Sequence, residues 1–142
     1  MKDAFGRLWR DESGQLTVFV AGMAMTLVLV AGLLVDGGSV LSARQQAVND
    51  AFEAARAGAE SLDPGELRAN GTVVVDPTAA VAAATAYLSS IGKHGTVTVN
   101  ANAVTVTVTF SHPLAILSAV GVGPVPIRGS ATATPVEGGA GA

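Results

Sequence analysis

An uninterrupted apolar run over residues 16–35 constrains the fold of this chain more than any other feature. The run reads LTVFVAGMAMTLVLVAGLLV and contains no charged residue. Because a helix rises about 1.5 Å per residue, about 20 apolar residues cover the roughly 30 Å hydrocarbon core of a bilayer. A helix in a soluble core rarely stays apolar on every face over such a length. The run therefore predicts a transmembrane helix over residues 15–36.

A cleavable secretory signal is the main alternative explanation of this run. The apolar region of such a signal usually has only about 7–15 residues. Asp36-Gly37-Gly38-Ser39 follows the run, without a convincing Ala-x-Ala cleavage site. The pattern therefore favours a retained anchor.

Basic residues near the ends of the run predict its orientation. Lys2, Arg7 and Arg10 precede the run, whereas Arg44 is the first basic residue after it. Lys and Arg are enriched on the cytoplasmic side of membrane spans, and acidic residues count for little. We therefore expect residues 1–14 in the cytoplasm and everything beyond Asp36 outside it, in a single-pass membrane protein.

The helix is expected to continue past the membrane as an amphipathic segment over residues 37–62. Gly37-Gly38 is the expected weak point between its two halves, and Asp63-Pro64-Gly65 is expected to end it. The predicted apolar face consists of Leu41, Val48, Phe52, Ala55, Ala59 and Leu62. The predicted polar side consists of Gln45, Asn49, Glu53, Arg56 and Glu60.

Residues 66–134 are predicted to form a small domain outside the cytoplasm. The pattern predicts, in order, a short strand over 72–75, a helix over 78–91, a hairpin of strands 96–99 and 104–110, a short helix over 113–120 and a strand over 125–134. The helix is alanine-rich, with Val81, Thr85 and Leu88 along one side. The hairpin residues expected to face the core are Val97, Val99, Val104, Val106, Val108 and Phe110. The threonines would form a wet face. The fold class is thus α+β, with an antiparallel sheet of about four strands and one packed helix. The tail over 135–142 is Gly/Ala-rich and expected to be disordered.

Composition and motifs argue against several classes of function. A net charge of −3 disfavours nucleic-acid binding, which needs clustered Lys and Arg. The chain has no cysteine, its histidines His94 and His112 lie far from other candidate ligands in sequence, and no Gly-x-Ser-x-Gly motif occurs. We therefore expect no enzyme activity, no cofactor, no metal and no small-molecule substrate.

Asp36 and several glycines are the candidate interaction residues. Asp36 lies at the outer border of the apolar run, where it either marks the boundary or contacts a neighbouring subunit. Small residues within the apolar run, including Gly22 and Gly32, would allow another helix to approach closely.

Three stretches of the sequence together resemble a known family. They are Asp11-Glu12-Ser13-Gly14-Gln15 before the apolar run, Val35-Asp36-Gly37-Gly38 at its end with Arg44-Gln45-Gln46-Ala47-Val48-Asn49-Asp50-Ala51 beyond it, and a Thr/Val hairpin with Gly129-Ser130-Ala131-Thr132-Ala133 near the C-terminus. This arrangement is similar to the TadE/TadG-like proteins of tight-adherence (Flp) pilus systems, over nearly the whole chain.

The resemblance implies a bacterial envelope protein with a pilin-like fold, held in the bacterial cell membrane by its single span. Pilin-like members carry a leader that ends in glycine and is cut by a prepilin peptidase, with a glutamate as fifth residue of the mature helix. Gly14 and Gln15 would flank such a cut here, but the fifth residue is then Phe19. This departure favours an unprocessed, TadG-like protein over a minor pilin. Asp50 joins Gly22, Gly32 and Asp36 as a candidate for helix packing or subunit contact.

The function expected from the sequence is structural. The chain would be a non-enzymatic, membrane-anchored component of Flp pilus assembly, in contact with membrane lipid and with other pilus-assembly or pilin-like membrane proteins. A membrane-tethered module that binds or senses a ligand outside the cytoplasm is the alternative. A cleft with converging polar groups would favour that alternative, and a flat sheet face would not.

Overall fold

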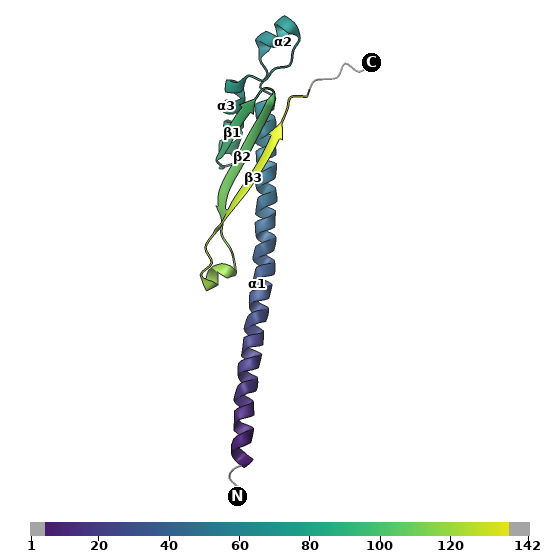
Figure 1. Ribbon diagram of the computed structural model, residues 1–142. Helices are drawn as coiled ribbons and strands as arrows, with labels where there is room; N and C mark the ends of the chain where they lie inside the picture. The colour runs from purple at the N-terminus through teal and green to yellow at the C-terminus, as the bar shows by residue number, and fades with distance from the viewer. Residues whose placement is uncertain (1–4, 137–142) are drawn as a thin grey trace, which may run out of the picture.

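One long helix carries a small sheet domain on its C-terminal half (Figure 1). The computed structural model describes residues 5–136, with side chains from Gly14 onward. Helix α1 (Phe5–Ala59) is by far the longest element, and the sheet packs along its C-terminal half (Figure 1). The α+β fold class predicted from the sequence is confirmed. Most of the predicted disordered tail lies outside the described residues.

Helix α1 is continuous from the apolar run into the domain. Figure 1 shows α1 as one unbroken helix. Gly37 and Gly38 lie within it, and both are exposed. The sequence had suggested a weak point there. Intact helical hydrogen bonding through this pair gives a direct mechanical connection between the apolar run and the sheet.

Small residues form the face of α1 that packs on the sheet. The predicted apolar face was partly wrong, because Leu41 and Phe52 are 69% and 48% exposed. Gly129 in the last strand explains the shift, since a Cβ added there would overlap the backbone of Ala47 and Val48. Strand and helix therefore approach too closely for large side chains. The residues that do pack there are Ala43, Ala47, Ala51, Ala54, Ala55 and Ala59.

The sheet has three antiparallel strands in the order β1 (Gly95–Asn100), β2 (Ala103–His112) and β3 (Val125–Ala133). The alternation of valine and threonine fixes its two faces, as predicted: Val104, Val106 and Val108 are fully buried. A two-residue turn joins β1 to β2, with Ala101 at a φ of 50°.

The predicted strand over 72–75 is not part of the sheet, so the sheet has three strands and not about four. Val75 makes only an isolated bridge with Leu62. The Asn102 side chain in the hairpin turn instead binds this segment, accepting from the Val75 N–H at 3.1 Å and donating to the Val73 carbonyl at 2.7 Å. A side-chain amide thus satisfies backbone groups that a neighbouring strand would otherwise bond.

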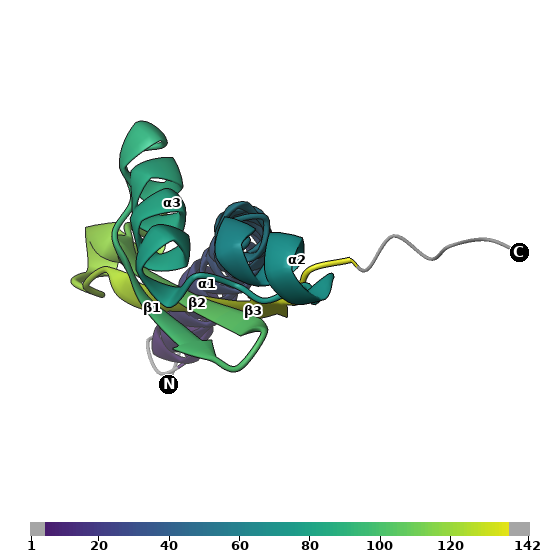
Figure 2. The same ribbon diagram turned by 90° about the horizontal axis from the view of Figure 1, so that it is seen from above.

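Three shorter helices complete the fold. Helix α3 (Pro77–Ser90) and the outer part of α1 lie on the same side of the sheet (Figure 2). Helix α3 buries Ala80, Ala84 and Leu88, whereas Val81, on the side noted in the sequence, is 40% exposed. Helix α2 (Pro64–Asn70) buries no residue, and the 3₁₀-helix η1 (Leu117–Val120) lies between β2 and β3.

Candidate functional site

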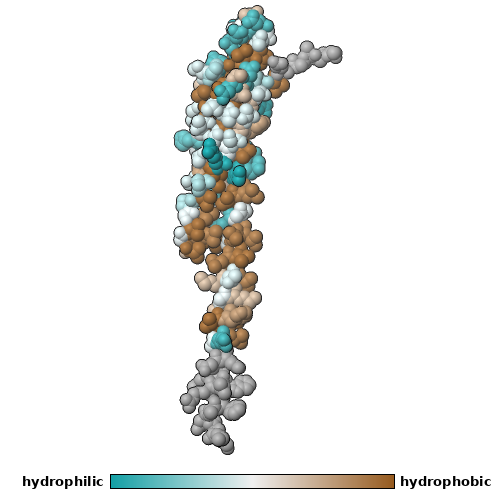
Figure 3. Space-filling model, in the orientation of Figure 1, coloured by the Kyte–Doolittle hydropathy of each residue, from teal (hydrophilic) through white to brown (hydrophobic). Residues whose placement is uncertain are grey.

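The apolar part of α1 contacts almost nothing else in the described chain. Its large side chains are exposed, for example Val18 at 74% and Leu34 at 73%. Figure 3 shows this part as a largely hydrophobic column below the sheet domain. Within the described residues, one helix is long and apolar enough to cross a membrane. The arrangement is consistent with a single-pass membrane anchor.

Asp36, at the end of this column, is buried by the connection between β2 and β3. Its side chain is 1% exposed. Oδ1 accepts from the backbone N–H of Ala115 at 2.8 Å, and Oδ2 accepts from that of Leu117 at 2.7 Å. The Ile116 N–H lies between them, 3.2 Å from Oδ1 and 3.1 Å from Oδ2. Successive N–H groups that converge in this way form a favourable site for an anionic group.

The connection over residues 113–124, here called the β2–β3 loop, reads PLAILSAVGVGP and has no charged residue. Leu114 is buried, and Ile116 lies against Gly32 on α1. A Cβ added to Gly32 would lie only 2.8 Å from Ile116 Cγ2, so this contact requires glycine, which has no side chain, at position 32. The loop therefore contacts α1 at two positions one helical turn apart, Gly32 and Asp36.

A second contact joins the end of β2 to α1. The ring nitrogen Nε2 of His112 lies 3.3 Å from the Ser39 hydroxyl, which itself donates to the Asp36 carbonyl at 2.8 Å. His112 is thus a strand-end residue in a structural contact. Together with the carboxylate bonds, this contact fixes how α1 enters the sheet domain.

Residues 14–61 match the model of a protein family described as "Putative Flp pilus-assembly TadE/G-like". The chain carries a TadE/G-like segment. This confirms the resemblance over residues 14–61 and links that segment to Flp pilus assembly. No curated protein and no solved structure matches the chain.

The TadE/G-like segment contains every interaction residue predicted from the sequence. Two of them, Gly32 and Asp36, meet at the β2–β3 loop. Gly14 and Gln15 lie in an exposed part of α1, and a Cβ added at Gly22 would meet nothing within 4 Å. Asp50 is half-buried, and within the described residues its buried Oδ2 has no hydrogen-bond partner. Contacts of these residues with other subunits stay predictions.

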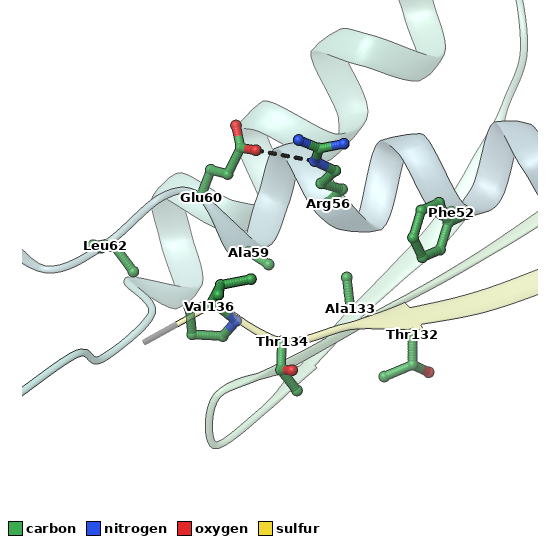
Figure 4. A pocket seen from close by; sticks show the side chains of 10 residues that line it. Phe52, Arg56, Ala59, Glu60, Leu62, Thr132, Ala133, Thr134 and Val136 are labelled. Carbon is green, nitrogen blue, oxygen red and sulfur yellow. Dashed lines mark hydrogen bonds and ion pairs between the residues drawn. The ribbon is translucent and has the colours of Figure 1, made fainter. Parts of the chain in front are cut away.

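An open groove of about 720 Å³ lies at the end of the TadE/G-like segment, beside the end of β3. Phe52 and Leu62 contribute apolar surface, and Arg56 pairs with Glu60 at an Nε–Oε1 distance of 3.2 Å. Figure 4 shows this ion pair on the side of the helix away from the strand. The polar groups of the groove do not converge on a common point.

The outer face of the sheet is occupied by hydroxyl groups that bond one another. The Thr105 and Thr132 hydroxyls are 2.8 Å apart, and those of Thr107 and Ser130 are 3.0 Å apart. Such cross-strand pairs stabilise a sheet. Because these hydroxyls are already bonded to one another, they do not favour this face as the ligand site of a tethered binding module.

No group of three or more His, Cys, Asp or Glu side chains is placed to hold a metal ion within residues 14–136. His94 lies in the connection before β1, as the sequence suggested. The structure accordingly directs attention to the junction of α1 and the β2–β3 loop.

Sequence reasoning found Asp36 but missed its partner. Some 80 residues separate the carboxylate from the N–H groups that it binds. One signal was available, namely a connection between strands that is apolar and uncharged. Loops in water are usually polar at the surface, so this composition marks a loop with an apolar environment.

Proposed function

We propose that this chain is a non-enzymatic, membrane-anchored component of Flp pilus assembly. The match of residues 14–61 to the TadE/G-like family carries the proposal, because the matched segment includes the exposed apolar helix. Continuity of α1 supports a mechanical role, since a load on the sheet domain passes through one helix into the membrane. Residues 1–14 lie in the cytoplasm and the sheet domain lies outside it.

Within this function, the chain is a TadG-like accessory protein that stays in the membrane, and not a minor pilin. The apolar run contains no acidic residue, and Phe19 occupies the position at which pilin-like members carry glutamate. Its partners are membrane lipid and other membrane proteins of the assembly apparatus. Gly22 and Asp50 are the candidate residues for those protein contacts: a Cβ added at Gly22 would meet nothing within 4 Å, and within the described residues the buried Oδ2 of Asp50 has no hydrogen-bond partner.

A deletion strain tests the proposed role. Loss of the gene should reduce surface pili and adhesion, and the full-length chain supplied in trans should restore both. Normal pilus numbers in the deletion strain would contradict the proposal. After pili are sheared from the cells, the chain should stay with the membrane fraction; recovery within purified filaments would identify it as a minor pilin.

A further inference from the structure

We propose that the β2–β3 loop lies in the outer lipid leaflet, so that the protein contacts the membrane through this loop as well as through α1. The occupant of the loop's apolar surface is then lipid. The inference rests on the membrane anchor and not on the role in pilus assembly.

The position of the loop along α1 gives its depth. Ile116 packs against Gly32, which lies one helical turn, about 6 Å, before Asp36. Gly32 belongs to the apolar run, whose neighbouring side chains Leu33 and Leu34 are 62% and 73% exposed. A membrane that covers those two leucines also reaches Ile116. Figure 1 shows the loop extending below the sheet along α1, toward the N-terminus.

The surface of the loop has the chemistry of a membrane-contacting segment. Ile116, Val120 and Val122 are 38%, 58% and 44% exposed, with no charge between Pro113 and Pro124. In water this would be an unexplained apolar patch. It continues the hydrophobic surface of the helix beside it, as Figure 3 shows.

Several backbone groups of the loop are hydrogen-bonded within the protein. Non-helical backbone is tolerated at membrane depth only where its polar groups are bonded within the protein or in a wet cavity. Asp36 accepts from three successive N–H groups, those of residues 115–117. Gly121 and Val122 donate to the carbonyls of Ser118 and Leu117. By accepting from these N–H groups, the Asp36 carboxylate lowers the cost of placing an irregular segment against lipid. The loop in turn covers the negative charge of Asp36, which would be costly if it faced lipid directly.

Basic side chains lie where lipid phosphates would be expected. Arg44 and Arg128 line one depression between α1 and β3, together with Val40 and Val125. Arg44 is about 12 Å beyond Asp36 along the helix. Arginine that lies just outside an apolar segment can bind headgroup phosphate. The apolar loop lies at the level expected for acyl chains, and the two arginines lie at the level expected for headgroups. This order matches a lipid leaflet and favours lipid over a protein partner.

Depth-dependent fluorescence quenching tests the proposal on the full chain. The natural sequence has no cysteine, so single cysteines can carry an environment-sensitive dye. The probe position is Val120, with Val18 in the middle of the apolar run as positive control. The matched negative control is Leu67, an exposed apolar residue on α2 at the far end of the domain. The labelled chains are reconstituted at low density into phosphatidylcholine–phosphatidylglycerol vesicles.

Nitroxide-labelled acyl chains should quench the dye at Val120 about threefold or more over Leu67, since interfacial segments lie roughly 5–10 Å below the surface. Aqueous iodide should show the reverse order. Equal quenching at Val120 and Leu67, with strong quenching at Val18, would overturn the inference and leave the anchor intact. Weak lipid quenching at Val18 as well would overturn both the inference and the proposed function.

Asp36→Asn provides a second test. The amide keeps the size of the side chain but loses one acceptor oxygen and the negative charge. In the variant, lipid quenching at Val120 should fall at least about twofold, because one of the two oxygens that accept from the N–H groups of residues 115–117 is replaced by an NH₂ donor, and the N–H group left without an acceptor draws the loop toward water. Asp50→Asn, on the same helix but away from the loop, should leave that quenching unchanged. A loop that stays equally deep in Asp36→Asn would contradict the part assigned to the carboxylate.

Discussion

At the scale of single residues, Gly129 sets the distance between the sheet and α1. A side chain at this position would overlap the backbone of Ala47 and Val48. The close approach explains why alanines, and not the larger Leu41 and Phe52, form the packed face of the helix. The domain's core therefore gains its density from close backbone contact, since it contains few large side chains.

Gly129→Ala should destabilise the sheet domain by about 1–3 kcal/mol, the usual cost of overpacking a well-packed contact. Thermal unfolding of the chain in detergent, followed by circular dichroism in the strand region, measures the change. Gly123→Ala is the matched control, because an added Cβ at Gly123 meets nothing within 4 Å. Equal melting temperatures for the two variants would show that the contact at Gly129 is less tight than described.

At the scale of elements, two helices begin in the same way but differ in what they bury. Asp76 caps α3 by accepting from the N–H groups of Thr78 and Ala79 at 2.9 and 3.1 Å. Asp63 caps α2 by accepting from Gly65 and Glu66 at 2.7 and 3.3 Å. Helix α3 contributes to the core, whereas α2 buries nothing. The caps are chemically alike, but only one helix is coupled to the rest of the domain.

Asp76→Ala should therefore lower the stability of the domain by about 1 kcal/mol, the typical value of an N-cap. Asp63→Ala should fray α2 and leave the unfolding of the domain nearly unchanged. Chemical denaturation of the two variants in parallel makes the comparison. A larger loss from Asp63→Ala would mean that α2 supports the core through contacts other than side-chain burial.

Elements with a local pattern could be predicted from the sequence, and contacts between distant segments could not. Alternating valine and threonine identified the β1–β2 hairpin and its buried face because the strand period is visible in the residues themselves. The packed face of α1 depends on Gly129, in a different element, and hydrophobicity alone favoured Leu41 and Phe52 over alanine. The segment around Val75 had strand composition but was bonded by Asn102.

In the candidate site too, the local feature could be predicted from the sequence and the distant contact could not. Asp36 stood out because it is an acid at the border of an apolar run. Its binding of the Ala115 and Leu117 N–H groups required the fold to bring β2 and β3 along α1. No periodicity connects segments so far apart in sequence.

At the scale of the whole molecule, α1 joins the apolar run to the sheet domain, and its two ends are expected on opposite sides of the membrane. Basic residues before the apolar run predict that the N-terminus lies inside. A cysteine at Thr98, on the exposed sheet face, should react with a membrane-impermeant maleimide in intact spheroplasts. A cysteine at Ala4 should react only after permeabilisation. The opposite labelling pattern would reverse the orientation and exclude an outer role for the sheet domain.

Every role proposed above depends on retention of the apolar run, and the N-terminus and intact mass of the protein from native cell envelopes show whether it is retained. We expect the unprocessed chain beginning at Met1, which leaves the whole apolar run in place. A chain beginning at Gln15 would retain the anchor but show that a peptidase cuts after Gly14, and the protein would then be a minor pilin. A chain beginning beyond Val35 would contradict the membrane anchor, because the apolar run would be a discarded signal.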